Sequence, residues 1–199
     1  MKAKIAVLVS GGGTNLQALI DAQGKVLTSG EIVLVVSNNP DAYALERAKK
    51  AGITTEVVLK TTQEAFEERL KAVLVTHHID LIILAGFMTI LTERFTACWP
   101  KRIINVHPSL IPSFCGAGFY GLRVHRAALD YGVKVTGATV HFVNEIPDGG
   151  EIIAQRAVEI KPGDTPEILQ RRVMEQAEWI LLPRAAETVC ASILGGIEK

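Results

Sequence analysis

Asn105 and His107 are the two residues whose types and spacing best suit chemistry in this sequence. They end an apolar run that begins at Ile103, and Pro108 and Pro112 then prevent the chain from continuing as a helix or a central strand. Pro108 favours extended backbone at His107, so the two side chains should project from the same side of a strand end. An Asn amide can donate to a developing oxyanion, and His titrates near neutral pH. The competing interpretation is a strand whose polar side chains merely cap a loop.

A glycine turn at residues 10–15 is the second candidate site. It follows an apolar run at residues 5–9 and precedes apolar residues at helical spacing. Three successive glycines suggest close backbone approach, and backbone N–H groups at the start of a helix could hold one phosphate. The dinucleotide fingerprint is missing, because Leu16 occupies its third glycine position and residues 37–39 lack the ribose-binding acid. We interpret the turn as a phosphate site, with a purely structural turn as the alternative.

His141 and Asp148 admit more than one interpretation. Together with His107 they offer two imidazoles and a carboxylate, but their spacing matches no common zinc motif, so no metal is expected. Asp148 precedes Gly149 in a turn, where Asp is an ordinary residue. Its other role would be to accept a proton or to hold a protonated His107. These residues alone leave both roles open.

Alternating apolar runs and helical patterns predict the elements that position these residues. Strands are expected at residues 5–9, 32–36, 54–59 and 81–84, and helices from residue 16, at 42–50 and at 62–76. This alternation predicts a parallel sheet with helices on both faces, which binds ligands beyond the carboxyl ends of its strands. The loops at 10–15, 85–88 and 105–112 should meet there.

The second half of the chain has a different character. A glycine- and aromatic-rich loop at 116–120, expected to be mobile, precedes a helix at 122–131. Strands at 134–143 and 151–160 should pair antiparallel across a Pro-Asp-Gly-Gly turn. Pro166 begins a helix that runs to about residue 180, Pro183 breaks it or begins the next segment, and a last helix covers 185–194.

The predicted fold class is therefore α/β. We expect a Rossmann-like doubly wound sheet, parallel in its N-terminal half and with an antiparallel C-terminal addition. The pattern shows no repeat or linker, so residues 1–199 are predicted to form a single domain.

Composition narrows the class of protein. The 199 residues are 48% hydrophobic and carry no net charge, which argues against nucleic acid or an anionic membrane as the main partner. Cys98, Cys115 and Cys190 form no Cys-x-x-Cys pair, so a reducing cytoplasm is the natural setting. The apolar run at the N-terminus is too short for a signal peptide or a membrane span.

Four stretches together resemble the phosphoribosylglycinamide formyltransferase family. They are residues 9–17, 84–88, 105–110 and 137–150, and the resemblance covers essentially the whole chain in order. It implies a formyltransferase fold and an enzyme of purine biosynthesis. The enzyme would transfer the formyl group of 10-formyltetrahydrofolate, its co-substrate, to the amine of 5-phosphoribosylglycinamide, without a metal.

The resemblance also implies the roles of particular residues. The catalytic set would be Asn105, His107 and Asp148. The phosphoribosyl group would be bound by Gly11, Gly12, Gly13, Thr14, Asn15 and Glu178. The folate would be bound by Met88, Thr89, Ile90, Leu91, Asn105, Val143, Asn144 and Asp148. Thr89 and Gln63 stand where many members have Arg. The partners would be small molecules, and the protein a monomer or homodimer.

Two kinds of alternative function compete with this one. Other enzymes share the catalytic core, such as methionyl-tRNA formyltransferase and formyltetrahydrofolate hydrolase. The first calls for an extra C-terminal nucleic-acid-binding domain and the second for an N-terminal regulatory domain, and the sequence is expected to carry neither. A nucleotide-binding regulatory or redox module is the alternative from another class, and it would leave Asn105, His107 and Asp148 without a role.

Overall fold

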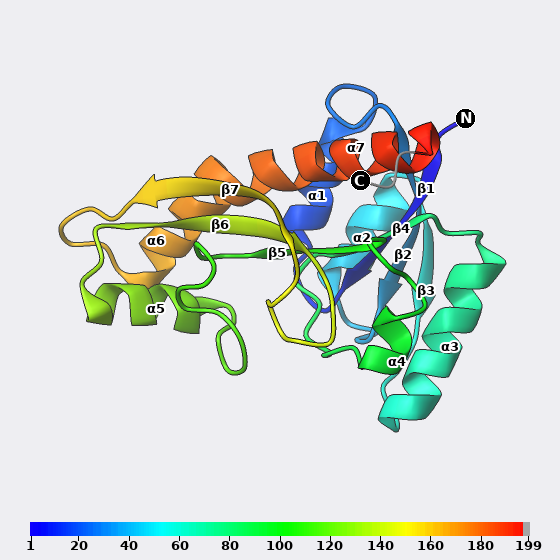
Figure 1. The fold of residues 1–199 in the computed structure, drawn as a ribbon, viewed down its shortest axis with the longest axis horizontal. Helices are drawn as coiled ribbons and strands as arrows, with labels where there is room; N and C mark the ends of the chain where they lie inside the picture. The colour runs from blue at the N-terminus through cyan, green and yellow to red at the C-terminus, as the bar shows by residue number, and fades with distance from the viewer. Residues whose placement is uncertain (197–199) are drawn as a thin grey trace.

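A seven-stranded mixed sheet forms the centre of the computed structural model, which describes residues 1–196 (Figure 1). The last residues of the predicted domain, 197–199, lie outside the described residues. The strand order is β3-β2-β1-β4-β5-β6-β7. The strands are β1 Ala3–Val9, β2 Gly30–Ser37, β3 Thr54–Val57, β4 Leu81–Leu84, β5 Ile103–His107, β6 Val135–Phe142 and β7 Ile152–Glu159.

Helices cover both faces of this sheet. They are α1 Thr14–Ala22, α2 Tyr43–Lys50, α3 Gln63–Thr76, α4 Glu93–Thr96, α5 Leu122–Tyr131, α6 Pro166–Val173, the π-helix η1 Met174–Glu178 and α7 Trp179–Gly195. No helix of residues 1–196 is both long and apolar enough to span a bilayer. The predicted α/β class, with a parallel first half and an antiparallel addition, is confirmed by the strand pairing.

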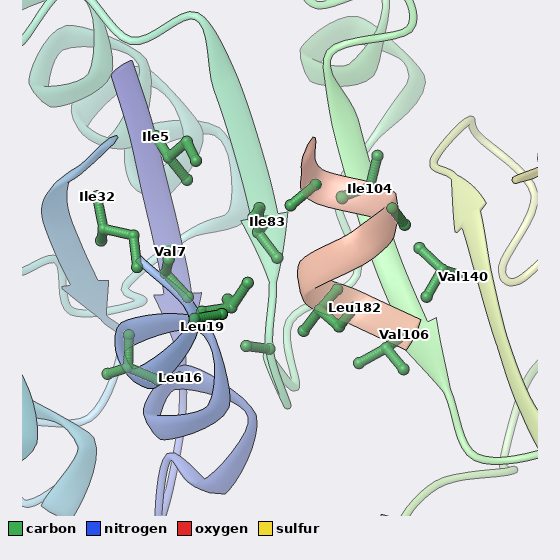
Figure 2. Close-up of a cluster of buried hydrophobic side chains, with 14 of the residues drawn as sticks. Ile5, Val7, Leu16, Leu19, Ile32, Ile83, Ile104, Val106, Val140 and Leu182 are labelled. Carbon is green, nitrogen blue, oxygen red and sulfur yellow. The ribbon is translucent and has the colours of Figure 1, made fainter. Parts of the chain in front are cut away.

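Two apolar layers fasten the helices to the sheet. Because side chains alternate along a strand, Ile5 and Val7 of β1 face α1 and α7, while Ala6 and Leu8 face α3. Figure 2 shows the first layer, in which Leu182 of α7 packs near Ile104 and Val106 of β5. Fully burying a side chain such as Leu182 stabilises the fold by about 1.5–3 kcal/mol.

The strand order reverses between β1 and β4. From β1 the chain builds outward to β2 and β3, and it then returns to place β4 and β5 on the other side. In such sheets the loops diverge at the reversal point and leave a crevice at the carboxyl ends of the strands. The loops after β4 and β5 line one cavity, and the loop after β1 contacts the loop after β4, where the Met88 N–H donates to Ser10 Oγ.

The C-terminal helix corrects one prediction. The helical path continues from Pro166 to Gly195, so Pro183 neither breaks it nor begins a new helix. In η1 the Trp179 N–H donates to the Met174 carbonyl, five residues back, which marks a π turn. Proline in a helix costs about 3 kcal/mol. Burial of the neighbouring residues Leu181, Leu182, Ala185 and Ala186 offsets this cost.

Smaller differences lie at element ends. The short helix α4 was not predicted, β3 ends at Val57 rather than residue 59, and β1 begins at Ala3. The antiparallel pair β6 and β7 agrees with the sequence to within one residue at each end. The loop 116–120 contains no regular secondary structure.

Gly137 of β6 is expected to tolerate no side chain. A Cβ there would lie 2.0 Å from the Arg156 carbonyl oxygen and 2.9 Å from Leu110 Cδ2. We predict that Gly137→Ala lowers the free energy of unfolding, measured by urea denaturation, by about 1–3 kcal/mol. The control is Ala157→Ser at the exposed residue paired with Gly137, expected to change it by less than about 0.5 kcal/mol. Equal stability of the two variants would contradict this packing.

Candidate active site

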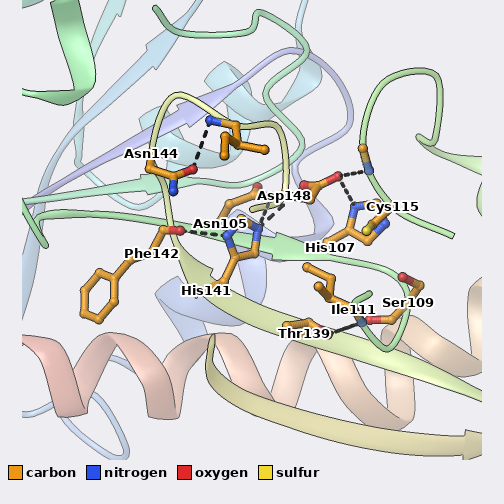
Figure 3. Close-up of polar contacts among 12 residues, drawn as sticks. Asn105, His107, Ser109, Ile111, Cys115, Thr139, His141, Phe142, Asn144 and Asp148 are labelled. Atoms are coloured by element: carbon orange, nitrogen blue, oxygen red, sulfur yellow. Dashed lines mark hydrogen bonds and ion pairs between the residues drawn. The ribbon is translucent and has the colours of Figure 1, made fainter. Parts of the chain in front are cut away.

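Asn105 lies directly opposite His141 in the antiparallel pair β5 and β6. His141 Nδ1 is 2.8 Å from the Phe142 carbonyl oxygen, and since a carbonyl only accepts, Nδ1 carries the hydrogen. In the neutral ring, Nε2 then accepts from the Asn105 amide Nδ2 at 3.2 Å. This contact fixes the orientation of the Asn105 amide (Figure 3).

His107 occupies the end of β5 and is 4% exposed. Its Nε2 donates to the Phe114 carbonyl oxygen at 2.9 Å, so the Nδ1 position gains or loses the mobile proton. Nδ1 lies 3.4 Å from Asp148 Oδ2. Burial lowers the pKa of His107 below its ordinary value, although the Asp148 carboxylate and the Phe114 carbonyl act in the opposite direction.

Asp148 reaches this strand end from the turn between β6 and β7. Its backbone has a φ of 57°, a left-handed conformation that Asp tolerates better than most residues. Oδ2 accepts the Gly116 N–H at 2.8 Å, and Oδ1 lies 3.6 Å from His141 Nε2. Burial acts to raise the pKa of Asp148, but contacts with His141, His107 and Gly116 hold it below its ordinary value. The site thus gathers one carboxylate between two imidazoles (Figure 3).

A cavity of about 600 Å³ opens over these side chains. Every residue predicted to bind the folate lines it, from Met88 to Leu91 and from Val143 to Asp148. Asn105, Asn15 and Glu178 line it as well, so predicted site residues from five separate segments meet in one space. Gly11, Gly12, Gly13 and Thr14 are not part of its lining and lie in the turn that leads to Asn15.

The glycine turn divides into two parts. Gly13 has a φ of 72°, and a Cβ there would lie 2.6 Å from Ala44 Cβ, so internal packing requires this glycine. Gly11 and Gly12 have nothing within 4 Å of such a Cβ. The exposed backbone of Gly11 and Gly12, just before the N-terminus of α1, therefore borders open space.

Glu178 lies at the end of η1 and is 6% exposed. Its Oε2 accepts the Asn15 amide Nδ2 at 2.7 Å, which connects the long C-terminal helix to the glycine turn. Burial raises the pKa of Glu178 to about 7, while the Asn15 hydrogen bond acts in the opposite direction. A carboxyl with this pKa can both accept and donate hydrogen bonds near neutral pH.

Comparisons with known proteins bear on this arrangement. The pattern of a family described as formyl transferase matches residues 3–185. The chain belongs to the formyl transferase family. A phosphoribosylglycinamide formyltransferase of Haemophilus influenzae is 43% identical over 183 residues, which cover 90% of this chain and 84% of that protein.

Other members of the family give a consistent comparison. A crystal structure of glycinamide ribonucleotide transformylase 1 from Symbiobacterium toebii has a TM-score of 0.89 and 39% identity, with 96% and 89% of the two chains covered. The human trifunctional purine biosynthetic protein adenosine-3 is 44% identical over 193 residues, 96% of this chain. Our chain spans about a fifth of the length of such trifunctional relatives.

Two histidines that line the cavity are not among the site residues predicted from sequence. His141 was considered only as a metal ligand, although its register opposite Asn105 places it in the cluster. His125 of α5 is fully buried and lines the cavity, but the amphipathic pattern of α5 gave no sign of this. Within residues 1–196 no group of three His, Cys, Asp or Glu side chains is arranged to hold a metal ion.

The two positions where many members have Arg make internal contacts here. Thr89 is 8% exposed, and its Oγ1 accepts the Asn38 amide at 2.8 Å. Gln63 donates to Glu67 and to the Ile90 carbonyl.

His125 should make stability fall in acid. Neither ring nitrogen has a hydrogen-bond partner among residues 1–196, and burial lowers its pKa from 6.5 to about 4. Between these pH values the unfolded chain binds a proton that the folded chain does not. His125 should therefore remove about 3 kcal/mol of stability as pH falls from 6.5 to 4. We predict that His125→Leu flattens the acid side of the stability curve in urea unfolding, and parallel curves for the two proteins would contradict the assignment.

Proposed function

We propose that this protein transfers the formyl group of 10-formyltetrahydrofolate to the amine of 5-phosphoribosylglycinamide, a step of purine biosynthesis. The observation that carries the proposal is the gathering of Asn105, His107 and Asp148 beneath one cavity. The cavity extends from Asn15 and Glu178 to the loop that follows β4, so it reaches both proposed binding regions. Relatives that bear the name of this enzyme add support.

The phosphoribosyl end would bind at the glycine turn. The open space beside Gly11 and Gly12, the free N–H groups at the start of α1 and the helix dipole suit a phosphate. Gly13, Thr14 and Asn15 continue this cradle, and Glu178 would hydrogen-bond the ribose hydroxyls.

The folate end would bind on the opposite side of the cavity. Met88, Ile90 and Ile146 expose apolar surface there, which suits the flat face of a pterin ring. Main-chain groups of Met88, Thr89, Ile90 and Leu91 and of the turn Val143, Asn144 and Asp148 would supply the polar contacts. The co-substrate is formylfolate, and the proposal involves no metal.

The chemistry follows from the three polar side chains. The substrate amine attacks the formyl carbon, a C–N bond forms, and the bond from that carbon to folate N10 breaks as N10 gains a proton and the amine loses one. The Asn105 N–H not used by His141 and a protonated His107 would stabilise the oxyanion. In the structure Phe114 accepts from His107 Nε2, so this contact must be exchanged for the substrate oxygen. Asp148 would favour the protonated ring and assist proton transfer, through water.

We also propose the setting of the reaction. The enzyme acts on small molecules in the cytoplasm, without nucleic acid or membrane, as a monomer or a homodimer. The absence of net charge argues against nucleic acid or an anionic membrane as a partner.

A spectroscopic assay of formylfolate deformylation tests the proposed reaction. Deformylation should depend on added glycinamide ribonucleotide and yield one formylated product per folate released. Deformylation at the same rate without the amine would identify a hydrolase instead. Tight binding of NAD without folate binding in calorimetry would favour the nucleotide-binding module.

Substitution of the polar set should affect the rate far more than the stability. We predict that Asn105→Ala and Asp148→Asn each lower kcat by about a hundredfold or more. Asn105→Ala removes an oxyanion donor, a loss that costs roughly 3–4 kcal/mol, and Asp148→Asn removes the carboxylate that favours the protonated His107 ring. The thermal midpoint should change little. Asp130→Asn, the same chemical change on the exposed face of α5, serves as the matched control. Near-wild-type turnover of Asp148→Asn would contradict its role.

A further inference from the structure

The segment 88–92 belongs to no strand or helix, and its residues 88–91 form one wall of the cavity. Within the described residues, 88–91 make no backbone-to-backbone hydrogen bond. Side chains hold the segment instead. Ser10 Oγ accepts the Met88 N–H at 2.9 Å, and Asn38 donates to Thr89 Oγ1 at 2.8 Å. The shape of this wall therefore depends on a few contacts from outside it.

Two side chains of α3 hold the second half of the segment. Gln63 and Glu67 are four residues apart and thus lie on one helix face. Gln63 Nε2 donates to the Ile90 carbonyl at 2.9 Å. Glu67 Oε1 accepts the Thr92 N–H at 2.7 Å, and Glu67 Oε2 accepts the Thr92 hydroxyl at 2.6 Å. The two α3 residues are joined by a hydrogen bond of 2.7 Å from Gln63 Nε2 to Glu67 Oε1.

Glu67 differs from the carboxylates beside it. Glu64 and Glu68 are exposed and pair with Arg94 at 2.8 and 3.1 Å. Glu67 is only 7% exposed, and its hydrogen-bond partners are the neutral groups of Gln63 and Thr92. A buried polar group needs hydrogen-bond partners, and Glu67 finds them in the segment after β4 as well as on its own helix. At this position a carboxylate can accept two hydrogen bonds from Thr92 at once, one from its backbone N–H and one from its hydroxyl.

We propose that Glu67 and Gln63 are positioning residues for formylfolate binding. They fix the main chain from Ile90 to Thr92, so the folate side of the cavity is formed before the ligand arrives. A ligand that must order this wall itself binds more weakly, in proportion to the fraction of molecules in which the wall is formed. Neither residue lines the cavity, so the effect is confined to the wall and leaves the reacting atoms untouched. The inference rests on the proposed function of the site.

Gln63→Met is the sharpest test, because it keeps the length of the side chain and removes the donor to Ile90. It should raise the KM for formylfolate, and the Kd of an unreactive folate analogue, by about tenfold, equivalent to about 1.4 kcal/mol. The kcat and the KM for glycinamide ribonucleotide should stay within about twofold. Hydrogen exchange of residues 88–92 should speed up in the variant and slow again with the analogue bound.

Glu67→Gln provides a second variant, and Glu64→Gln and Glu68→Gln are matched controls on the same helix. Glu67→Gln should show the same selective rise in the folate KM, and the two controls should retain wild-type constants. If the wild type is active, either of two results would overturn the inference. One is an unchanged folate KM in Gln63→Met, and the other is a rise in both KM values accompanied by a comparable fall in kcat. A wild type that neither binds the analogue nor transfers a formyl group would overturn the proposed function and this inference with it.

Discussion

The placement of the Asp148 carboxylate between His107 and His141 is the interaction on which the candidate site depends. The carboxylate is carried by a tight turn in which Asp148 itself has a positive φ. Two residues later, a Cβ at Gly150 would lie 1.7 Å from the Phe142 carbonyl oxygen. The turn therefore folds back closely onto the end of β6, and this brings the carboxylate to 3.4 Å from His107. Its contact with the Gly116 N–H also ties the loop after β5 to the same point.

The change of strand direction at β5 makes this placement possible. On one side β5 pairs parallel with β4, so its carboxyl end opens into the crevice with the loops after β1 and β4. On the other side it pairs antiparallel with β6, which puts His141 directly opposite Asn105. The turn after β6 then returns to the crevice.

The sequence predicted those parts of the site that local chemistry determines. Pro108 marks the end of β5, and this local signal is enough to place Asn105 and His107 at the carboxyl end of that strand. Continuous apolar runs predicted the central strands β1, β2 and β4, because burial on both faces of a sheet leaves a clear local trace. The association of Asp148 with His107 was only one of two alternatives, because 41 residues of chain separate them and their contact follows from strand pairing.

The features that sequence reasoning missed depend on tertiary contacts. The helix continues past Pro183 because packing of its neighbours outweighs a local signal. The burial of Glu67 and its grip on Thr92 depend on how α3 meets the segment after β4. His125 resembles any polar residue of an amphipathic helix until the fold covers it.

An NMR titration of His107 tests the central claim most directly. The ring signals would be followed against pH in the unliganded wild type and in Asp148→Asn, with assignment from a His107→Gln variant. Burial lowers the pKa of His107, and the negative charge of Asp148 raises it. Asp148→Asn removes that charge, so the pKa of His107 should fall. An unchanged or higher pKa of His107 would show that Asp148 does not control its proton, and it would contradict the account.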